Sequence, residues 1–118
     1  MNALPGPWEP EGRNAALVYR LRGLGMACAV LHVGAHPDDE ESGLLSYFAH
    51  KHAVRVVYWS ATRGEGGQNR LNAFTGEALG IYRTWESQAA RALDGAECLF
   101  GPFIDFGYSK NALDTFNK

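Results

Sequence analysis

Strand-like apolar runs alternate with helix-like stretches along most of this 118-residue chain. The strand-like runs are Met26–Ala35, Val54–Trp59 and Glu97–Ile104, and the predicted helices cover residues 13–24, 41–52 and 76–93. Strand, helix and strand in succession form a right-handed βαβ unit, which places its strands in parallel. The sequence therefore predicts an α/β domain with a mainly parallel sheet over residues 26–118. An N-terminal arm and a short helix over residues 1–25 precede it.

The apolar patterns also predict which surfaces are covered. The run Met26–Ala35 has no polar alternation apart from His32, which predicts a strand covered on both faces of the sheet. The helix over residues 76–93 is expected to be amphipathic and to end at Gly95. Its apolar residues recur three and four positions apart: Ala78, Tyr82, Trp85, Ala89 and Ala92. All three tryptophans are assigned mainly to packing: Trp8, Trp59 and Trp85.

Composition excludes several classes of protein. The chain is 46% hydrophobic and 20% charged with a net charge of -2, which is typical of a soluble domain and gives no basic surface for nucleic acid. We see neither a membrane-spanning run nor a signal peptide, so a cytoplasmic protein is expected. Cys28 and Cys98 lie in apolar runs, which predicts buried free thiols and favours a reducing compartment.

The segment His36–Glu41 concentrates charge directly after the first strand. It holds one imidazole and four carboxylates, at Asp38, Asp39, Glu40 and Glu41, and these like charges must be offset. One interpretation is an acidic helix start, with Asp38 and Glu41 forming a capping box or with Asp39 as the N-cap. The other is a divalent cation. Composition alone leaves both open.

Zinc chemistry would use these residues naturally. A catalytic zinc takes three protein ligands from His, Asp or Glu and keeps one position for water. His36 and Asp39 are three residues apart across a turn stiffened by Pro37, so both side chains can face one ion. Asp38 would then point elsewhere, free to act as a general base. The expected cofactor is zinc, although another divalent metal would also fit such ligands.

Several stretches resemble the PIG-L/LmbE-like family of zinc-dependent de-N-acetylases. The opening motif is Gly34-Ala35-His36-Pro37-Asp38-Asp39-Glu40, and the later, correctly ordered stretches are Thr62–Asn69, Arg83 with Glu86, and Asp105–Ser109. The resemblance implies a Rossmann-like three-layer fold and removal of an N-acetyl group, usually from a glucosamine unit. It also implies that His36 and Asp39 are zinc ligands, that Asp38 is the general base, and that Arg83 contacts substrate.

The chain departs from the family at the third zinc ligand, which the family takes from a downstream histidine. No histidine follows His52. His32 lies about 13 Å back along its strand, and His50 and His52 lie about 15 Å from the start of their helix, all too far to join His36. We therefore expect a truncated sheet, a third ligand after Lys118, and weak zinc binding by residues 1–118 alone.

Three residues are expected to contact substrate: Arg83, Glu65 and Asp105. Asp105 ends the third strand on the side of the sheet where ligands bind, so it is either a weak metal ligand or a substrate contact. The alternative for Arg83 is a surface ion pair with Glu86. Gly64, Gly66 and Gly67 either let the backbone approach a substrate or form a flexible turn, and they match no nucleotide-binding motif.

The predicted function is a zinc-dependent hydrolase that removes an N-acetyl group from a GlcNAc-type substrate. The substrate would be a small molecule, a glycan or a glycolipid. The alternative is a non-catalytic Rossmann-like module that binds a sugar or a nucleotide. A homo-oligomer is also possible, since an unpaired sheet edge favours self-association.

Overall fold

The structure is a computed structural model that describes residues 13–69, 73–109 and 111–117. The predicted N-terminal arm over residues 1–10, with Trp8, lies outside the described residues. The element order is helix α1 (Arg13–Leu24), strand β1 (Ala29–Gly34), helix α2 (Ser42–Ser46) continuing as the π-helix η1 (Tyr47–Lys51), strand β2 (Arg55–Ser60), helix α3 (Gly76–Asp94), strand β3 (Glu97–Phe100) and helix α4 (Ala112–Asn117).

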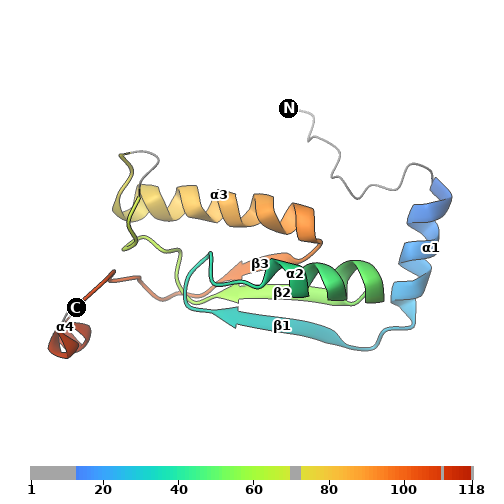
Figure 1. Cartoon of the computed structure of the whole chain (residues 1–118), viewed down its shortest axis with the longest axis horizontal. Coiled ribbons are helices and arrows are strands. Elements are labelled where there is room, and N and C mark those ends of the chain that lie inside the picture. Colours follow the sequence, from blue (N-terminus) through green and yellow to red (C-terminus); the bar gives the residue numbers. More distant parts are fainter. Residues whose placement is uncertain (1–12, 70–72, 110, 118) are drawn as a thin grey trace.

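The three strands form a parallel sheet in the order β1-β2-β3 (Figure 1). Val30 pairs with Val56, and Tyr58 lies between His32 on one side and Cys98 on the other. The α/β class and the parallel sheet are therefore confirmed. β3 is shorter than the predicted run to Ile104, because the chain leaves the sheet after Phe100.

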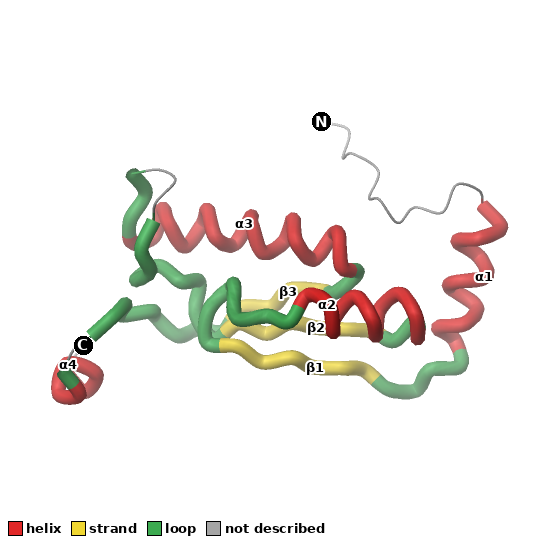
Figure 2. The backbone as a smooth tube through the Cα atoms, in the orientation of Figure 1, coloured by secondary structure: helices red, strands yellow, loops and turns green. Residues whose placement is uncertain are grey.

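Both connecting helices pack on one face of the sheet. α2 with η1 and α3 lie beside each other above the strands (Figure 2). The core between them and the sheet is formed by Leu45, Ala49, Val56 and Tyr58. α3 ends as predicted at Gly95, whose left-handed conformation (φ 81°) lets its N–H donate to the Arg91 carbonyl at 2.9 Å. None of the helices in the described ranges is long and apolar enough to cross a membrane.

The opposite face of the sheet is open, which corrects the expected burial of β1. Exposure alternates along β1 instead of being uniformly low, and Leu31 and Val33 are exposed on the open face. Leu99 of β3 is exposed as well. Within the described residues both crossover helices cover the other face, so the apolar run is buried on one side only.

The prediction that the apolar face of α3 packs against the sheet is also wrong. Trp85 is 67% exposed, and Ala78, Ala89 and Ala92 are exposed with it. The face turned to the sheet carries Leu79 together with polar residues: Thr84, Ser87, Arg91 and Asp94. These polar side chains are buried because each has a partner, such as the Gly80 carbonyl for Thr84 at 2.7 Å. Satisfied polar groups therefore replace the expected apolar packing.

The cysteines are both free, as expected, but they differ in exposure. Cys28 precedes β1 and is exposed, which contradicts its predicted burial. Cys98 lies on the covered face of β3, with its Sγ 3.1 Å from Ser87 Oγ. Burial raises the pKa of the Cys98 thiol, so this side chain behaves as a packing residue.

Candidate metal centre

Three loops meet at the carboxyl end of the sheet, where parallel folds bind their ligands. They follow β1 (His36–Glu40), β2 (Thr62–Asn69) and β3 (Asp105–Ser109). Thr62 joins the first two, because its N–H and its hydroxyl donate to the Ala35 carbonyl at 3.0 and 2.9 Å. The second and third loops touch where Gly66 packs directly on Gly107. The motifs separated in sequence therefore form one site.

His36 and Asp39 face each other in the first loop. Asp39 Oδ2 lies 3.2 Å from His36 Nδ1 and accepts hydrogen bonds from the N–H groups of His36 at 2.8 Å and Ala35 at 3.1 Å. The predicted capping roles are wrong, because Glu41 is the N-cap of α2 and no side chain caps that helix end. The Asp39 carboxylate folds back toward His36 instead of forward onto the helix.

This geometry fits a pair of zinc ligands. Two ligands with bonds of about 2 Å to one tetrahedral ion lie roughly 3–4 Å apart, and the Asp39 and His36 atoms meet that condition. An imidazole and a carboxylate are also donors that zinc accepts. The described residues contain no group of three His, Cys, Asp or Glu side chains arranged to hold a metal. The described part of the chain therefore brings together two side chains of the zinc-ligand type, both from one loop.

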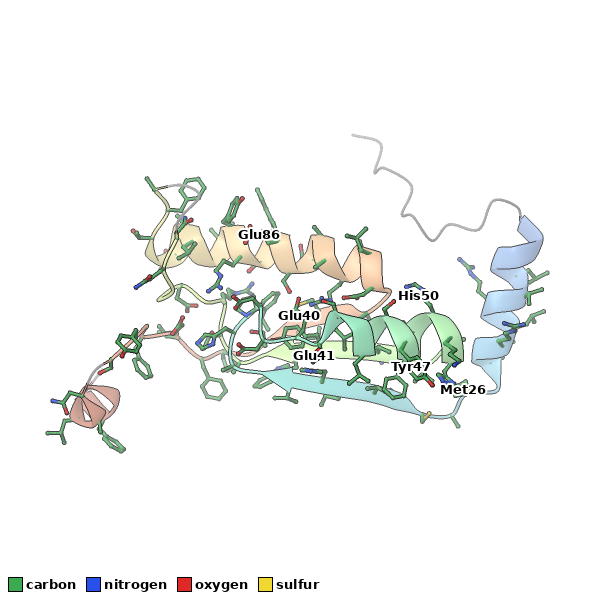
Figure 3. The ribbon with its side chains drawn as sticks, in the orientation of Figure 1. Met26, Glu40, Glu41, Tyr47, His50 and Glu86 are labelled. Carbon is green, nitrogen blue, oxygen red and sulfur yellow. The ribbon has the colours of Figure 1, made fainter. Side chains whose placement is uncertain are left out.

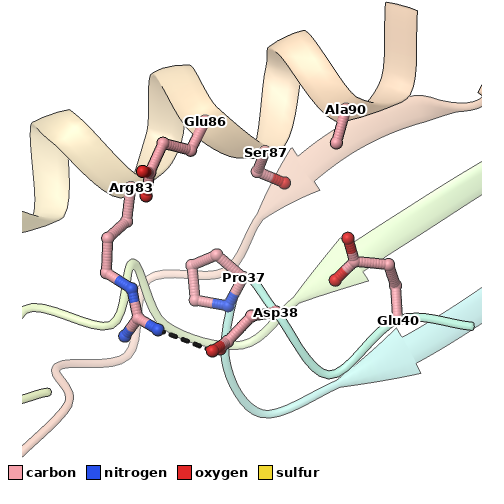
Figure 4. A pocket seen from close by; sticks show the side chains of 7 residues that line it. All are labelled: Pro37, Asp38, Glu40, Arg83, Glu86, Ser87 and Ala90. Carbon is pink, nitrogen blue, oxygen red and sulfur yellow. Dashed lines mark ion pairs between the residues drawn. The ribbon is translucent and has the colours of Figure 1, made fainter. Parts of the chain in front are cut away.

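Asp38 has a different partner. Its carboxylate forms an ion pair with Arg83 of α3 at 2.8 Å, and the Arg83 guanidinium also donates to the Gly64 carbonyl at 3.1 Å (Figure 4). Arg83 thus pairs across the site with Asp38, in place of the surface pair with Glu86 that the sequence left open. Neighbouring carboxylates in the loop have separate tasks, with Asp39 toward His36 and Asp38 toward Arg83.

A small cavity separates this loop from α3. Its volume is about 200 Å³, and seven residues line it: Pro37, Asp38, Glu40, Arg83, Glu86, Ser87 and Ala90 (Figure 4). Two of the acidic side chains that line it, Asp38 and Glu40, come from the first loop, and Arg83 supplies the positive charge. The cavity therefore presents hydrogen-bonding groups of both charges beside the ion pair.

Asp105 approaches the first loop from the loop after β3, not from the end of the strand as predicted, because β3 ends at Phe100. Its side chain is 8% exposed, and Oδ1 lies 3.7 Å from His36 Nε2 while accepting a hydrogen bond from the Gly107 N–H at 2.9 Å. Asp105 therefore faces the imidazole nitrogen opposite the one near Asp39. Glu65 is turned into its own loop, since its carboxylate accepts a hydrogen bond from the Arg63 N–H at 3.0 Å.

The glycines of the second loop permit close packing. Gly64 has φ +69°, and a Cβ there would collide with the Arg83 guanidinium. A Cβ at Gly66 would collide with the backbone of Asp105 and Gly107. Because these glycines lack side chains, the second loop can contact both Arg83 and the third loop. The sequence-based alternatives, a substrate-binding backbone or a flexible turn, did not include this structural role.

Comparison with known families agrees with this arrangement. The PIG-L model, described as GlcNAc-PI de-N-acetylase, matches residues 31–118, which is most of the chain and includes all three loops. The chain belongs to the PIG-L family. The family suggested by the His36–Glu40 motif is thus confirmed, and membership supports a de-N-acetylase or hydrolase function in general terms. No curated protein matches the chain.

The PIG-L motif is held by two residues that no sequence pattern singled out. Tyr58 of β2 is fully buried, and its hydroxyl donates to the His36 carbonyl. Burial, followed by the charges of Glu40 and Asp39, raises the pKa of Tyr58 to about 12, so the hydroxyl stays a donor at neutral pH. The only sequence signal was an aromatic residue inside a strand.

The second such residue is Arg91 of α3, which is 3% exposed. Its guanidinium donates to Glu40 Oε1 at 2.8 Å and to Asp94 Oδ2, and Figure 3 shows Glu40 between α3 and the sheet. Burial alone would lower the pKa of Arg91, but the hydrogen bonds to Asp94 and Glu40 outweigh it and raise the pKa. Glu40 is therefore paired in this PIG-L chain, not exposed at a helix start.

Proposed function

We propose that this chain carries the metal-and-base loop of a zinc-dependent hydrolase that removes an N-acetyl group from a GlcNAc-type substrate. The observation that carries the proposal is that the two adjacent carboxylates have different partners. Asp39 lies 3.2 Å from His36 Nδ1, and Asp38 is paired with Arg83 instead. Membership of a family described by de-N-acetylation supports the same chemistry.

In this proposal His36 and Asp39 would hold the zinc ion, since their side chains face each other at 3.2 Å. When bound, zinc supplies a Lewis acid that activates water and polarises the amide carbonyl. A further ligand from outside the pair would complete the usual set of three. The N–H groups of Ala35 and His36 hold the Asp39 carboxylate in place, so it is oriented before any metal arrives.

Asp38 is the proposed general base. It would take a proton from the water that attacks the amide carbon and pass it to the nitrogen as the C–N bond breaks, releasing acetate and a free amine. Arg83 holds the Asp38 carboxylate by its ion pair at 2.8 Å. Because the same guanidinium borders the cavity, it is also placed to contact the substrate.

Asp105 and Glu65 are proposed as further substrate contacts. Asp105 lies 3.7 Å from the His36 ring, which is within reach of a substrate bound at the metal. Glu65 would contact the substrate from the second loop, where the Arg63 N–H donates to its carboxylate at 3.0 Å. The substrate itself would be a small molecule, glycan or glycolipid that carries an N-acetylglucosamine unit.

The test is acetate release from N-acetylglucosamine derivatives, including a phosphatidylinositol conjugate, by the full chain supplied with zinc. Asp38→Asn removes the base but keeps the size of the side chain, so activity should fall at least ~100-fold while bound zinc is retained. Glu41→Gln is the matched control, because it neutralises a neighbouring acid that only forms the N-cap of α2. Undiminished activity of Asp38→Asn would remove the general base from the proposal. Sugar binding without any acetate release would favour the non-catalytic module instead.

A further inference from the structure

The segment His36–Glu40 lies between β1 and α2 and contains neither helix nor strand. Catalytic side chains must be held within about 0.5 Å of their working positions, which a loop achieves only with external support. His36, Asp38 and Asp39 all depend on this loop. The question is which residues outside it fix its two ends.

The first end is held from β2. Tyr58 is fully buried, is paired in register with His32, and stacks edge-on against the His32 ring at 5.4 Å. Its hydroxyl donates to the His36 carbonyl. The hydroxyl reaches the loop across Gly34, where a Cβ would collide with the phenol and lie 3.0 Å from Asp39 Cβ. A rigid strand residue therefore fixes the backbone of the first proposed metal ligand.

The second end is held from α3. Arg91 Nη2 donates to Glu40 Oε1 at 2.8 Å, and Asp94 Oδ2 accepts from the same guanidinium at 2.6 Å. The side chains of Arg91, Asp94 and Glu40 are only 3, 7 and 11% exposed. Asp94 is itself fixed, because its other oxygen accepts from the Ala96 N–H at 3.0 Å. Glu40 immediately follows Asp39, so the Glu40–Arg91 ion pair restricts the backbone at the second end of the loop.

The two supports also touch each other. The Arg91 guanidinium lies 5.5 Å from the centre of the Tyr58 ring, a distance at which a cation and an aromatic face attract. Tyr58 and Arg91 therefore form a continuous connection from β2 to α3, and each also bonds one end of the loop. Neither residue reaches Asp38, and neither side chain offers a group to the proposed metal.

We propose that Tyr58 and Arg91 are positioning residues that clamp the two ends of the His36–Glu40 loop and so align the proposed metal ligands and base. The inference deepens the proposed function and rests on it for its effect on metal binding. Arginine suits this role because its planar guanidinium can bond two carboxylates at once, which a lysine ammonium does less well.

Zinc affinity of the full chain tests the clamp, measured by competition with a chromophoric chelator. Tyr58→Phe removes one hydroxyl and keeps the buried ring, and we expect zinc binding to weaken by about 10–100-fold, as for other residues that support metal ligands. Arg91→Lys should weaken it as well. The exposed Arg55–Glu97 pair, at 2.8 Å, provides the matched control, since Arg55→Lys alters an arginine–glutamate pair at the opposite end of β2.

A general loss of stability is separated from positioning by Val56→Ala. Val56 is buried in the same core cluster as Tyr58, so this variant loses core packing but keeps the Tyr58 hydroxyl and its ring. Its zinc affinity should stay within about threefold of the parent at temperatures where circular dichroism shows the variant fully folded. Equal weakening in Val56→Ala and Tyr58→Phe would overturn the proposal, and so would parent-like affinity in Tyr58→Phe.

A second readout does not depend on metal. The N–H groups of Ala35 and His36 donate to Asp39, so their hydrogen exchange reports the order of the loop. In Tyr58→Phe both amides should exchange at least ~10-fold faster than in the parent, beyond any change in global unfolding. Unchanged exchange would refute the clamp. If the parent chain binds no zinc, or binds it no more tightly than His36→Ala does, the proposed function fails. The hydrogen-exchange result still decides whether Tyr58 holds the loop in place.

Discussion

Replacing Arg91 with methionine should cost far more stability than any surface charge change in this chain. The substitution keeps a long apolar stem but leaves Glu40 and Asp94, 11 and 7% exposed, without their cation. Removing one partner of a buried ion pair typically costs about 3–5 kcal/mol. The corresponding change at the exposed Arg55–Glu97 pair should cost far less, because solvent screens both of its charges.

Urea unfolding followed by circular dichroism measures both costs under the same conditions. The difference in unfolding free energy between Arg91→Met and the parent gives the cost of leaving the two buried carboxylates without their cation. Adding Glu40→Gln to Arg91→Met should restore part of the lost stability. If Arg91→Met costs no more than Arg55→Met, the buried cluster does not stabilise the fold and the reasoning is refuted.

Three further predictions concern single residues. The pKa of Tyr58 is raised from 10.0 to about 12, so the stability that its protonated hydroxyl adds to the fold should be complete below pH 10 and lost as pH rises toward 12. The unfolding free energy should fall by roughly 2–3 kcal/mol over this range, and this fall should be absent in Tyr58→Phe. Gly64→Ala should destabilise by about 1–3 kcal/mol and displace Arg83 from Asp38, which a crystal structure of the variant would reveal. Trp85→Ser should change the unfolding free energy by no more than about 0.5 kcal/mol, because the ring is 67% exposed; a loss above ~2 kcal/mol would show that Trp85 is packed.

The order of elements was predictable because it depends on local patterns. Apolar runs such as Val54–Trp59 and the glycine at position 95 mark a strand and a helix end without reference to the rest of the chain. The His36–Glu40 motif likewise predicted its place at the carboxyl end of a strand. The bend of the Asp39 side chain toward His36 followed from a spacing of three residues across a proline turn.

Long-range partners were not predictable in the same way. Arg91 and Glu40 are 51 residues apart, and Tyr58 and His36 are 22 apart, so no sequence period connects them. The same limit explains the error in α3. The apolar residues of α3 recur regularly on the face that carries Trp85. The opposite face carries polar side chains that form hydrogen bonds and ion pairs with the sheet and the loop. The polar face of α3 is therefore buried, and the apolar stripe is exposed.

The location of a bound zinc ion tests the central claim most directly. Crystals of the full chain grown with zinc, and measured on both sides of the zinc absorption edge, would place the ion by its anomalous scattering. We expect one peak at about 2 Å from both His36 Nδ1 and an Asp39 oxygen, with Asp38 still paired with Arg83. A peak on His36 Nε2 beside Asp105, or no peak at this loop, would contradict the assignment of the ligands.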